Sequence, residues 1–108
     1  MKYLFLLILI FSISVFATES SPWSNIKVIQ SYPDYGGGDV ILTLDSSSSI
    51  CKGFWLKKDS PGQETTFSML LSAYHSKTKI KVWGHTDDSS KWPGSVKHFC
   101  RIYTVAYL

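Results

Sequence analysis

The spacing of the apolar residues changes once along the chain and then changes back, and this switch limits the folds available to it. Segments with an apolar period of two precede residue 60, a segment of helical period occupies residues 64–76, and period two returns after residue 78. Period two is typical of strands, and steps of three and four are typical of a helix. The sequence therefore predicts a mainly β chain with one helix, in the order β-β-β-α-β-β.

Five segments carry the strand pattern, and turn-forming residues separate them. After a polar stretch, TESSP, they are WSNIKVIQSY, DVILTLD, ICKGFWLK, TKIKVWG and VKHFCRIYTVAYL. Glycines at positions 36–38 supply the positive φ angles that a tight reversal after the first strand needs. In the last segment, Cys100, Ile102, Thr104 and Ala106 share one side, which is predicted to be buried.

One helix face is predicted to be buried, because Phe67, Leu70, Leu71 and Tyr74 recur at i, i+3, i+4 and i+7. A single helix between the third and fourth of five strands is the element order of the oligonucleotide/oligosaccharide-binding (OB) barrel. The sequence thus predicts a five-stranded OB-fold-like barrel whose helix plugs one end. An unrelated α+β sandwich is the alternative.

Residues 1–17 have the features of a secretory signal. Lys2 precedes a long apolar run, and Ala17, with Val15 two places before it, forms an acceptable cleavage site. A retained membrane anchor is the competing interpretation. The prediction is a signal peptide at 1–17, a single OB-fold-like domain at 18–108 with no later membrane span, and a secreted or periplasmic protein.

The two cysteines, Cys51 and Cys100, are predicted to form one disulfide, since an even pair in an exported chain most simply pairs with itself. The bond would tie the start of the third strand to the fifth, its neighbour in such a barrel. A redox or metal-binding thiol pair is the alternative, but CxxC spacing is missing.

Charge gives little sign of a nucleic-acid or membrane partner. Removal of Lys2 with the signal lowers the net charge from +3 to about +2. Lys77, Lys79 and Lys81 do form a basic stripe that ends at Trp83, a pattern that could bind single-stranded nucleic acid. Export argues against that function.

The histidines and aspartates can be arranged into catalytic or metal sites, but none fits an established motif. His85, Asp87 and Asp88 have no metal-ligand spacing, and no GxSxG turn accompanies His75, His85 or His98. Asp87 and Asp88 are adjacent and so poorly placed to face each other across a glycosidic bond. The chain is therefore predicted to be no enzyme, with no metal or cofactor.

Residues 81–95, KVWGHTDDSSKWPGS, are predicted to help form a sugar-binding surface. Trp92 could stack on the apolar face of a pyranose, while Asp87, Asp88 and Lys91 hold its hydroxyl groups. Tyr35, beside the glycine run, could contribute from the first connecting loop, which commonly flanks the binding face of such barrels.

The motifs WSNIKVI, ICKGFW, FSMLLSAY and KIKVWG, with Trp92 and the late Cys100, resemble the exported sugar-binding B subunits of pentameric bacterial toxins of the subtilase-cytotoxin and typhoid-toxin type. The resemblance implies a homopentameric ring of barrels around a pore lined by the helices, a separate toxin A chain, and glycan pockets on the outer side. A serine near the family's N-terminal strand contacts the sugar, and Ser24 matches it best.

Two functions follow from the sequence. The first is an exported, non-enzymatic protein that binds a cell-surface carbohydrate, as a ring-forming subunit of the toxin B type. The alternative is a monomeric periplasmic or secreted OB-fold interaction or stability domain without glycan binding, in which Trp83 and Trp92 only cover the barrel end.

Overall fold

The computed structural model describes residues 17–108, so the predicted signal peptide lies, apart from Ala17, outside the described residues. The elements follow one another as β1 (Thr18–Ser20), β2 (Ile26–Tyr32), β3 (Asp39–Leu44), β4 (Gly53–Leu56), α1 (Gln63–Ser76), β5 (Ile80–His85), a short 3-10 helix η1 (Asp88–Ser90) and β6 (Phe99–Tyr107). The prediction of a mainly β chain with one helix is confirmed for this part of the chain.

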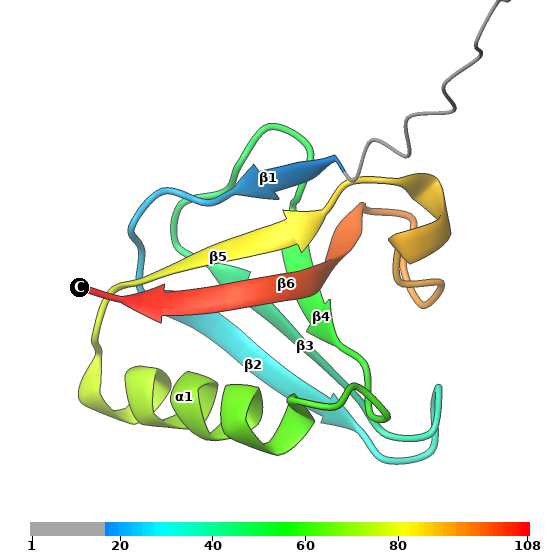
Figure 1. Ribbon diagram of the computed structural model, residues 1–108, viewed down its shortest axis with the longest axis horizontal. Helices are drawn as coiled ribbons and strands as arrows, with labels where there is room; N and C mark the ends of the chain where they lie inside the picture. The colour runs from blue at the N-terminus through cyan, green and yellow to red at the C-terminus, as the bar shows by residue number, and fades with distance from the viewer. Residues whose placement is uncertain (1–16) are drawn as a thin grey trace, which may run out of the picture.

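All six strands belong to one mixed sheet with the order β1-β5-β6-β4-β3-β2. The β4–β6 pair is parallel and every other neighbouring pair is antiparallel. The helix α1, between β4 and β5 in the chain, packs along one side of the sheet beside β2 and β6 (Figure 1).

In place of the predicted five-stranded barrel, the described chain forms a six-stranded sheet that is not closed into a barrel. Its edges are β1 and β2, consecutive pieces of chain that Pro22 and its neighbours separate. β1 pairs with β5 and β2 with β3, so the two edges do not pair with each other. The polar residues Thr18–Ser20, which the sequence pattern does not predict to be a strand, thus form an additional edge strand, β1.

The main core lies between α1 and the inner face of the sheet. It is a cluster of twelve buried residues to which every strand from β2 to β6 contributes, and its fully buried members include Leu42, Phe54, Leu70, Ile80, Val82 and Cys100. At about 25 cal/mol per Å² of apolar surface, this burial is the dominant favourable contribution to folding.

The buried face of α1 is rotated from the predicted one. Leu70 and Ala73 are buried and Phe67 packs partly against them, whereas the side chain of Tyr74 is 40% exposed. The buried position is thus Ala73, one residue before Tyr74. The ring of Tyr74 is therefore available at the surface.

A β-bulge changes which residues of β6 face the core. Trp83 pairs with Thr104 but the next residue, Gly84, pairs with Ile102, so Tyr103 is the extra residue of β6. Ile102 and Val105, three positions apart, both pack against the core. The predicted strict alternation holds only up to the bulge, because one inserted residue moves the following side chains to the other face.

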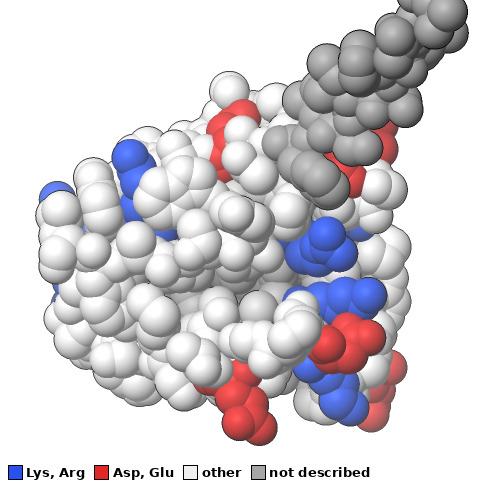
Figure 2. Space-filling model, viewed as in Figure 1, with Lys and Arg blue, Asp and Glu red and all other residues white. Residues whose placement is uncertain are grey.

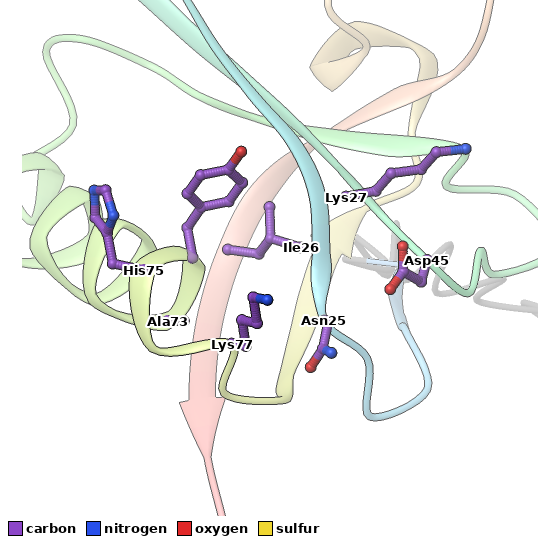
Figure 3. A pocket seen from close by; sticks show the side chains of 8 residues that line it. Asn25, Ile26, Lys27, Asp45, Ala73, His75 and Lys77 are labelled. Atoms are coloured by element: carbon purple, nitrogen blue, oxygen red, sulfur yellow. The ribbon is translucent and has the colours of Figure 1, made fainter.

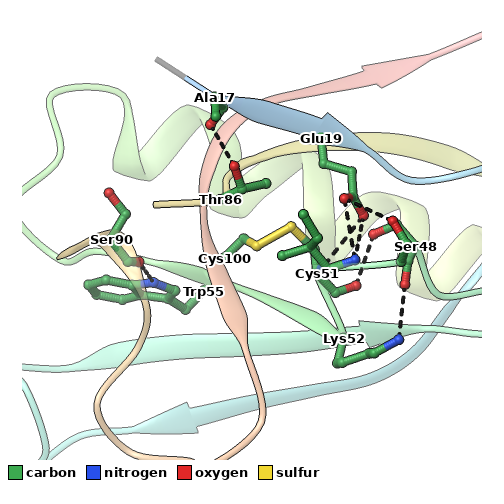
Figure 4. The surroundings of a disulfide bond; sticks show 11 residues. Ala17, Glu19, Ser48, Cys51, Lys52, Trp55, Thr86, Ser90 and Cys100 are labelled. Atoms are coloured by element: carbon green, nitrogen blue, oxygen red, sulfur yellow. Dashed lines mark hydrogen bonds between the residues drawn. A yellow bond between two sulfur atoms is a disulfide. The ribbon is translucent and has the colours of Figure 1, made fainter. Parts of the chain in front are cut away.

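The predicted disulfide is confirmed: Cys51 and Cys100 are bonded, and their Cα atoms are 5.4 Å apart (Figure 4). Both residues are buried, and the bond joins the segment just before β4 to its parallel neighbour β6. Beside it, the carboxylate of Glu19 on β1 accepts hydrogen bonds from the backbone N–H groups of Ile50 and Cys51 at 2.9 and 3.4 Å. This contact ties the edge strand to the segment that enters β4.

Within residues 17–108, no helix combines the length and apolar character needed to cross a bilayer; α1, the one α-helix there, has 14 residues.

Candidate functional site

The predicted sugar-binding loop, which joins β5 to β6, folds over the outer face of the sheet. Trp92 is 3% exposed, and its indole N–H donates to the buried carboxylate of Asp39 with an Nε1–Oδ2 distance of 3.0 Å. The indole N–H of Trp55 donates to the carbonyl oxygen of Ser90 at 2.8 Å, which fixes the other side of the loop. These two contacts hold the loop against β3 and β4.

The Trp92 ring lies among protein side chains. The ring centroids of Tyr32, Tyr35 and Phe99 are 5.3, 5.6 and 5.8 Å from that of Trp92. With Ile41 and Trp55, the rings of Trp92, Phe99 and Tyr32 form a second apolar cluster on the outer face of the sheet. The burial of Trp92 leaves no open ring face for a sugar and argues against the predicted stacking role.

The polar residues of the loop close it on itself. The carboxylate of Asp87 accepts hydrogen bonds from the hydroxyls of Ser89 and Ser90, and these bonds hold the pKa of Asp87 below its ordinary value. The ammonium of Lys91 donates to the carbonyl oxygen of Val96 at 3.3 Å, while Asp88 is exposed. The hydrogen bonds of Asp87 and Lys91 thus stabilise the conformation of the loop.

His85, at the end of β5, lies against Tyr103 with ring centroids 5.4 Å apart. Partial burial and the nearby positive charge of Arg101 lower the pKa of His85, and the nearby carboxylate of Asp87 offsets part of that shift. The neutral imidazole is therefore favoured.

Ser24 lies apart from this loop, in the segment that joins the two edge strands. Its side chain is 3% exposed, and its hydroxyl accepts from the backbone N–H of Ser46 at 3.0 Å and donates to the carbonyl of Asn25 at 3.1 Å. Its backbone forms an isolated bridge with Ile80. Ser24 supports the fold here, and the structure does not bring it to Tyr35 and Trp92.

A hollow of about 440 Å³ lies between β2 and the C-terminal turn of α1 (Figure 3). The helix supplies the side chains at one wall, the start of β2 supplies the opposite wall, and the residue after β3 closes the rim. Its lining residues are Asn25, Ile26, Lys27, Asp45, Ala73, Tyr74, His75 and Lys77.

At the helix side of the hollow, α1 ends in a left-handed residue. Lys77 has φ 53° and ψ 40°, and its backbone N–H donates to the carbonyl of Ala73. The N–H of Thr78 donates to the same oxygen at 3.0 Å, so the chain turns directly into β5. On the other side, the N–H of Asp45 donates to the carbonyl of Asn25 at 3.0 Å and fixes the start of β2.

Residues with several kinds of side chain line the hollow. They are the aromatic Tyr74, the basic Lys27 and Lys77 and the acidic Asp45; the side chain of Lys27 extends from β2 away from α1 (Figure 3). The side-chain oxygen of Asn25 is buried and has no hydrogen-bond partner in the described part of the chain. A buried amide oxygen without a partner costs free energy, so this end of β2 is not fully satisfied by the fold.

Sequence patterns do not reveal the hollow. Ser24, one residue before Asn25, is the predicted site residue nearest to it in the chain, and periodicity assigns Tyr74 to the buried helix face. The two walls are about fifty residues apart in the chain, and residues 25–27 and 74–77 form no recognisable motif. The one local signal is a lysine at the position after the helix, where glycine is usual.

Charge is sparse on the face drawn in Figure 2. Outside the grey atoms, acidic and basic side chains gather towards its edges and most of the surface between them is uncharged. The surface in view therefore offers no broad basic area of the kind that binds a phosphate backbone.

Among residues 17–108, no group of three or more His, Cys, Asp or Glu side chains could hold a metal ion. A comparison of the chain with known protein families, with curated proteins and with solved structures finds no match.

Proposed function

We propose that the chain is a non-enzymatic carbohydrate-binding protein whose site is the hollow between β2 and α1. One observation carries the proposal: an aromatic residue, an amide, a carboxylate residue and two lysines line one hollow, and they are Tyr74, Asn25, Asp45, Lys27 and Lys77. A saccharide needs this combination, because its ring has an apolar face and its hydroxyl groups both donate and accept hydrogen bonds.

Four of the eight lining residues have a function in this proposal. The ring of Tyr74 would stack on the C–H face of a pyranose. The amide oxygen of Asn25 and the carboxylate of Asp45 would accept from sugar hydroxyls, and Lys27 would donate to them. The volume of about 440 Å³ suits one or two sugar units, since ligand pockets for small molecules begin near roughly 300 Å³.

The strand order supports placing the domain in the OB class, whose five-stranded sheets close only partly. Strands β2 to β6 follow the order β2-β3-β4-β6-β5 with β4 and β6 parallel, and the helix lies between β4 and β5. The bridge from Ser24 to Ile80 brings the start of β2 to β5. A five-stranded Greek-key arrangement of this kind commonly binds oligosaccharides or oligonucleotides.

A secreted or periplasmic location is part of the proposal. The disulfide between Cys51 and Cys100 supports it, because such bonds form and persist mainly in oxidising compartments.

The function as one subunit of a homopentameric ring with a separate toxin A chain is likewise a proposal. The edges of β1 and β2 favour self-association, since an exposed strand edge is a template for another chain. Light scattering of residues 18–108 tests this point: a five-fold mass supports the ring, and a monomer favours an isolated interaction domain.

A glycan array probed with residues 18–108 tests the carbohydrate site. The expected result is binding to a defined group of glycans that Tyr74→Ala abolishes. Tyr103→Ala is the matched control, because Tyr103 is an exposed tyrosine, 65% accessible, that does not line the hollow. Absence of glycan binding, or equal losses in the two variants, would reject the proposal.

A further inference from the structure

Lys77 has a backbone conformation that a lysine rarely adopts. Among residues 17–108 it is the one non-glycine residue with a positive φ angle; the other three positive values belong to Gly36, Gly37 and Gly38. The left-handed region is unfavourable for residues with a Cβ, and helices that end in this way usually have glycine, or sometimes asparagine, at this position. The presence of lysine, and not glycine, at this backbone position therefore requires an explanation.

The fold itself does not supply that reason. The capping hydrogen bond to the carbonyl of Ala73 comes from the backbone N–H of Lys77, and glycine would donate it equally well. The side chain is exposed, and within the described residues its ammonium has no hydrogen-bond or ion-pair partner. A positive charge at a helix C-terminus is mildly favourable, but a lysine one turn earlier would give this benefit without the backbone cost.

The position of Lys77 in the hollow does supply a reason. Lys77 and Asn25 line the same hollow from opposite walls, and Figure 3 shows both side chains between the end of α1 and the start of β2. The side-chain oxygen of Asn25 is closed to solvent, whereas the side chain of Lys77 is exposed at the hollow. The ammonium of Lys77 can donate to an oxygen of a bound sugar, because it has three N–H donors and no acceptor.

We propose that Lys77 is a ligand-contacting residue that largely determines the affinity of the hollow, retained at a backbone position that favours glycine because its ammonium binds the saccharide. This inference rests on the proposed carbohydrate function and adds to it a residue that contributes to binding without stabilising the fold. Strained backbone at a residue that lines a binding site is a recognised association.

The test uses Lys77→Gly and Lys77→Asn, which both accept the left-handed conformation and both remove the ammonium. Lys97→Asn is the control, since Lys97 is an exposed lysine that does not line the hollow. Each variant is measured twice: its thermal unfolding midpoint without ligand, and by calorimetry its dissociation constant for the glycan that gives the strongest array signal with the wild-type chain.

Both Lys77 variants are expected to bind that glycan at least about tenfold more weakly, as for a hydrogen bond to a charged group. Their midpoints are expected to be unchanged or up to about 4 °C higher, because relief of the backbone offsets the lost charge at the helix end. Lys97→Asn should match the wild-type chain in both measurements.

A second measurement reports contact directly. Acetylation of the wild-type chain with the N-hydroxysuccinimide ester of acetic acid, followed by mass spectrometry, gives the reaction rate of each lysine. With the glycan bound, Lys77 is expected to react at least about threefold more slowly, since a bound ammonium is shielded, while Lys97 keeps its rate.

The possible failures are distinguishable. If the wild-type chain binds no glycan on the array, the proposed function is rejected and the function of Lys77 with it. If the wild-type chain binds but Lys77→Gly binds equally well and acetylation of Lys77 is not slowed, the hollow stands and the inference about Lys77 is overturned. A midpoint lowered by more than about 4 °C in both variants would show that the side chain stabilises the fold, which also overturns it.

Discussion

The indole of Trp92 and the carboxylate of Asp39, 53 positions apart in the chain, form a buried hydrogen bond of 3.0 Å across the outer face of the sheet. Asp39 is 2% exposed, and its second carboxylate oxygen has no partner within the described residues. The bond is therefore the main compensation for the removal of this carboxylate from water. It also holds the loop between β5 and β6 on the sheet.

The first prediction concerns this bond. Trp92→Phe keeps most of the buried ring area but removes the N–H, so Asp39 loses its side-chain donor. The expected cost is about 2–3 kcal/mol of unfolding free energy, measured by urea denaturation. In combination with Asp39→Asn the cost should be smaller than the sum of the two single changes, because the partners are coupled. Additive costs would show that the bond contributes little.

The second prediction concerns the pH dependence of stability at Glu19. Burial of the carboxylate raises its pKa, but hydrogen bonds from serine hydroxyls and backbone N–H groups of residues 48–51 together outweigh this and lower the pKa below 4.5. The stability that this group contributes is thus present above the unfolded-state pKa and is lost as the pH falls through the lower, folded-state pKa.

The measurement is the thermal midpoint of the wild-type chain and of Glu19→Gln from about pH 7 to about pH 3. The wild-type midpoint should exceed that of the variant at neutral pH, and the difference should shrink as the pH falls below about 5. A difference that stays constant over this range would contradict the assignment.

The third prediction concerns the disulfide. Cys51 and Cys100 are 49 positions apart, and a loop of that length corresponds to about 4 kcal/mol of stabilisation in the chain-entropy model. Replacement of both cysteines by serine should lower the unfolding free energy by about 2–4 kcal/mol, measured by denaturant titration. Reduction of the wild-type chain with a dithiol should give a similar loss, whereas a variant of full stability would mean that the reduced chain is already constrained.

The fourth prediction concerns close packing at Gly84. A Cβ built on Gly84 would lie 2.6 Å from the Cβ of Cys100 and 2.9 Å from the ring of Phe54, inside the main core. Gly84→Ala should therefore cost about 1–3 kcal/mol through overpacking. Gly62→Ala is the comparison, because the nearest atom to its added Cβ, on Thr66, is 4.0 Å away and φ is −99°, so that its smaller expected cost comes from the N-cap of α1 and not from overpacking. Equal effects in the two variants would contradict this reason.

Much of the fold is predictable because each element has its own local pattern. Periodicity predicts the helix at 64–76 and it occupies Gln63–Ser76, and the five predicted strands match β2 to β6 with small differences at their ends. The pattern misses β1 because its three residues, Thr18 to Ser20, are polar and pair only with an edge of β5. The pattern does not predict the bulge in β6, because the amino-acid types around the unpaired residue, Tyr103, do not differ from those of a regular strand.

The binding site is far less predictable. The residues around Trp92 have a composition typical of an exposed loop, yet Trp92 itself is buried by Asp39, Tyr32 and Phe99. Tyr74 occupies a helix position that periodicity assigns to the core, yet it lies at the edge of the hollow. In both cases the outcome depends on neighbours from distant segments, which a local pattern does not contain.

The sequence by itself determined the element types, their order and the single disulfide, because backbone geometry ties side-chain direction to spacing over a few residues and because only two cysteines exist. The tertiary structure decided that the sheet stays open, that Trp92 is covered and that Asn25 and Lys77 line one hollow. These features depend on the twist and register of strands far apart in the chain and on the summed packing of the side chains between them, and no short segment specifies either.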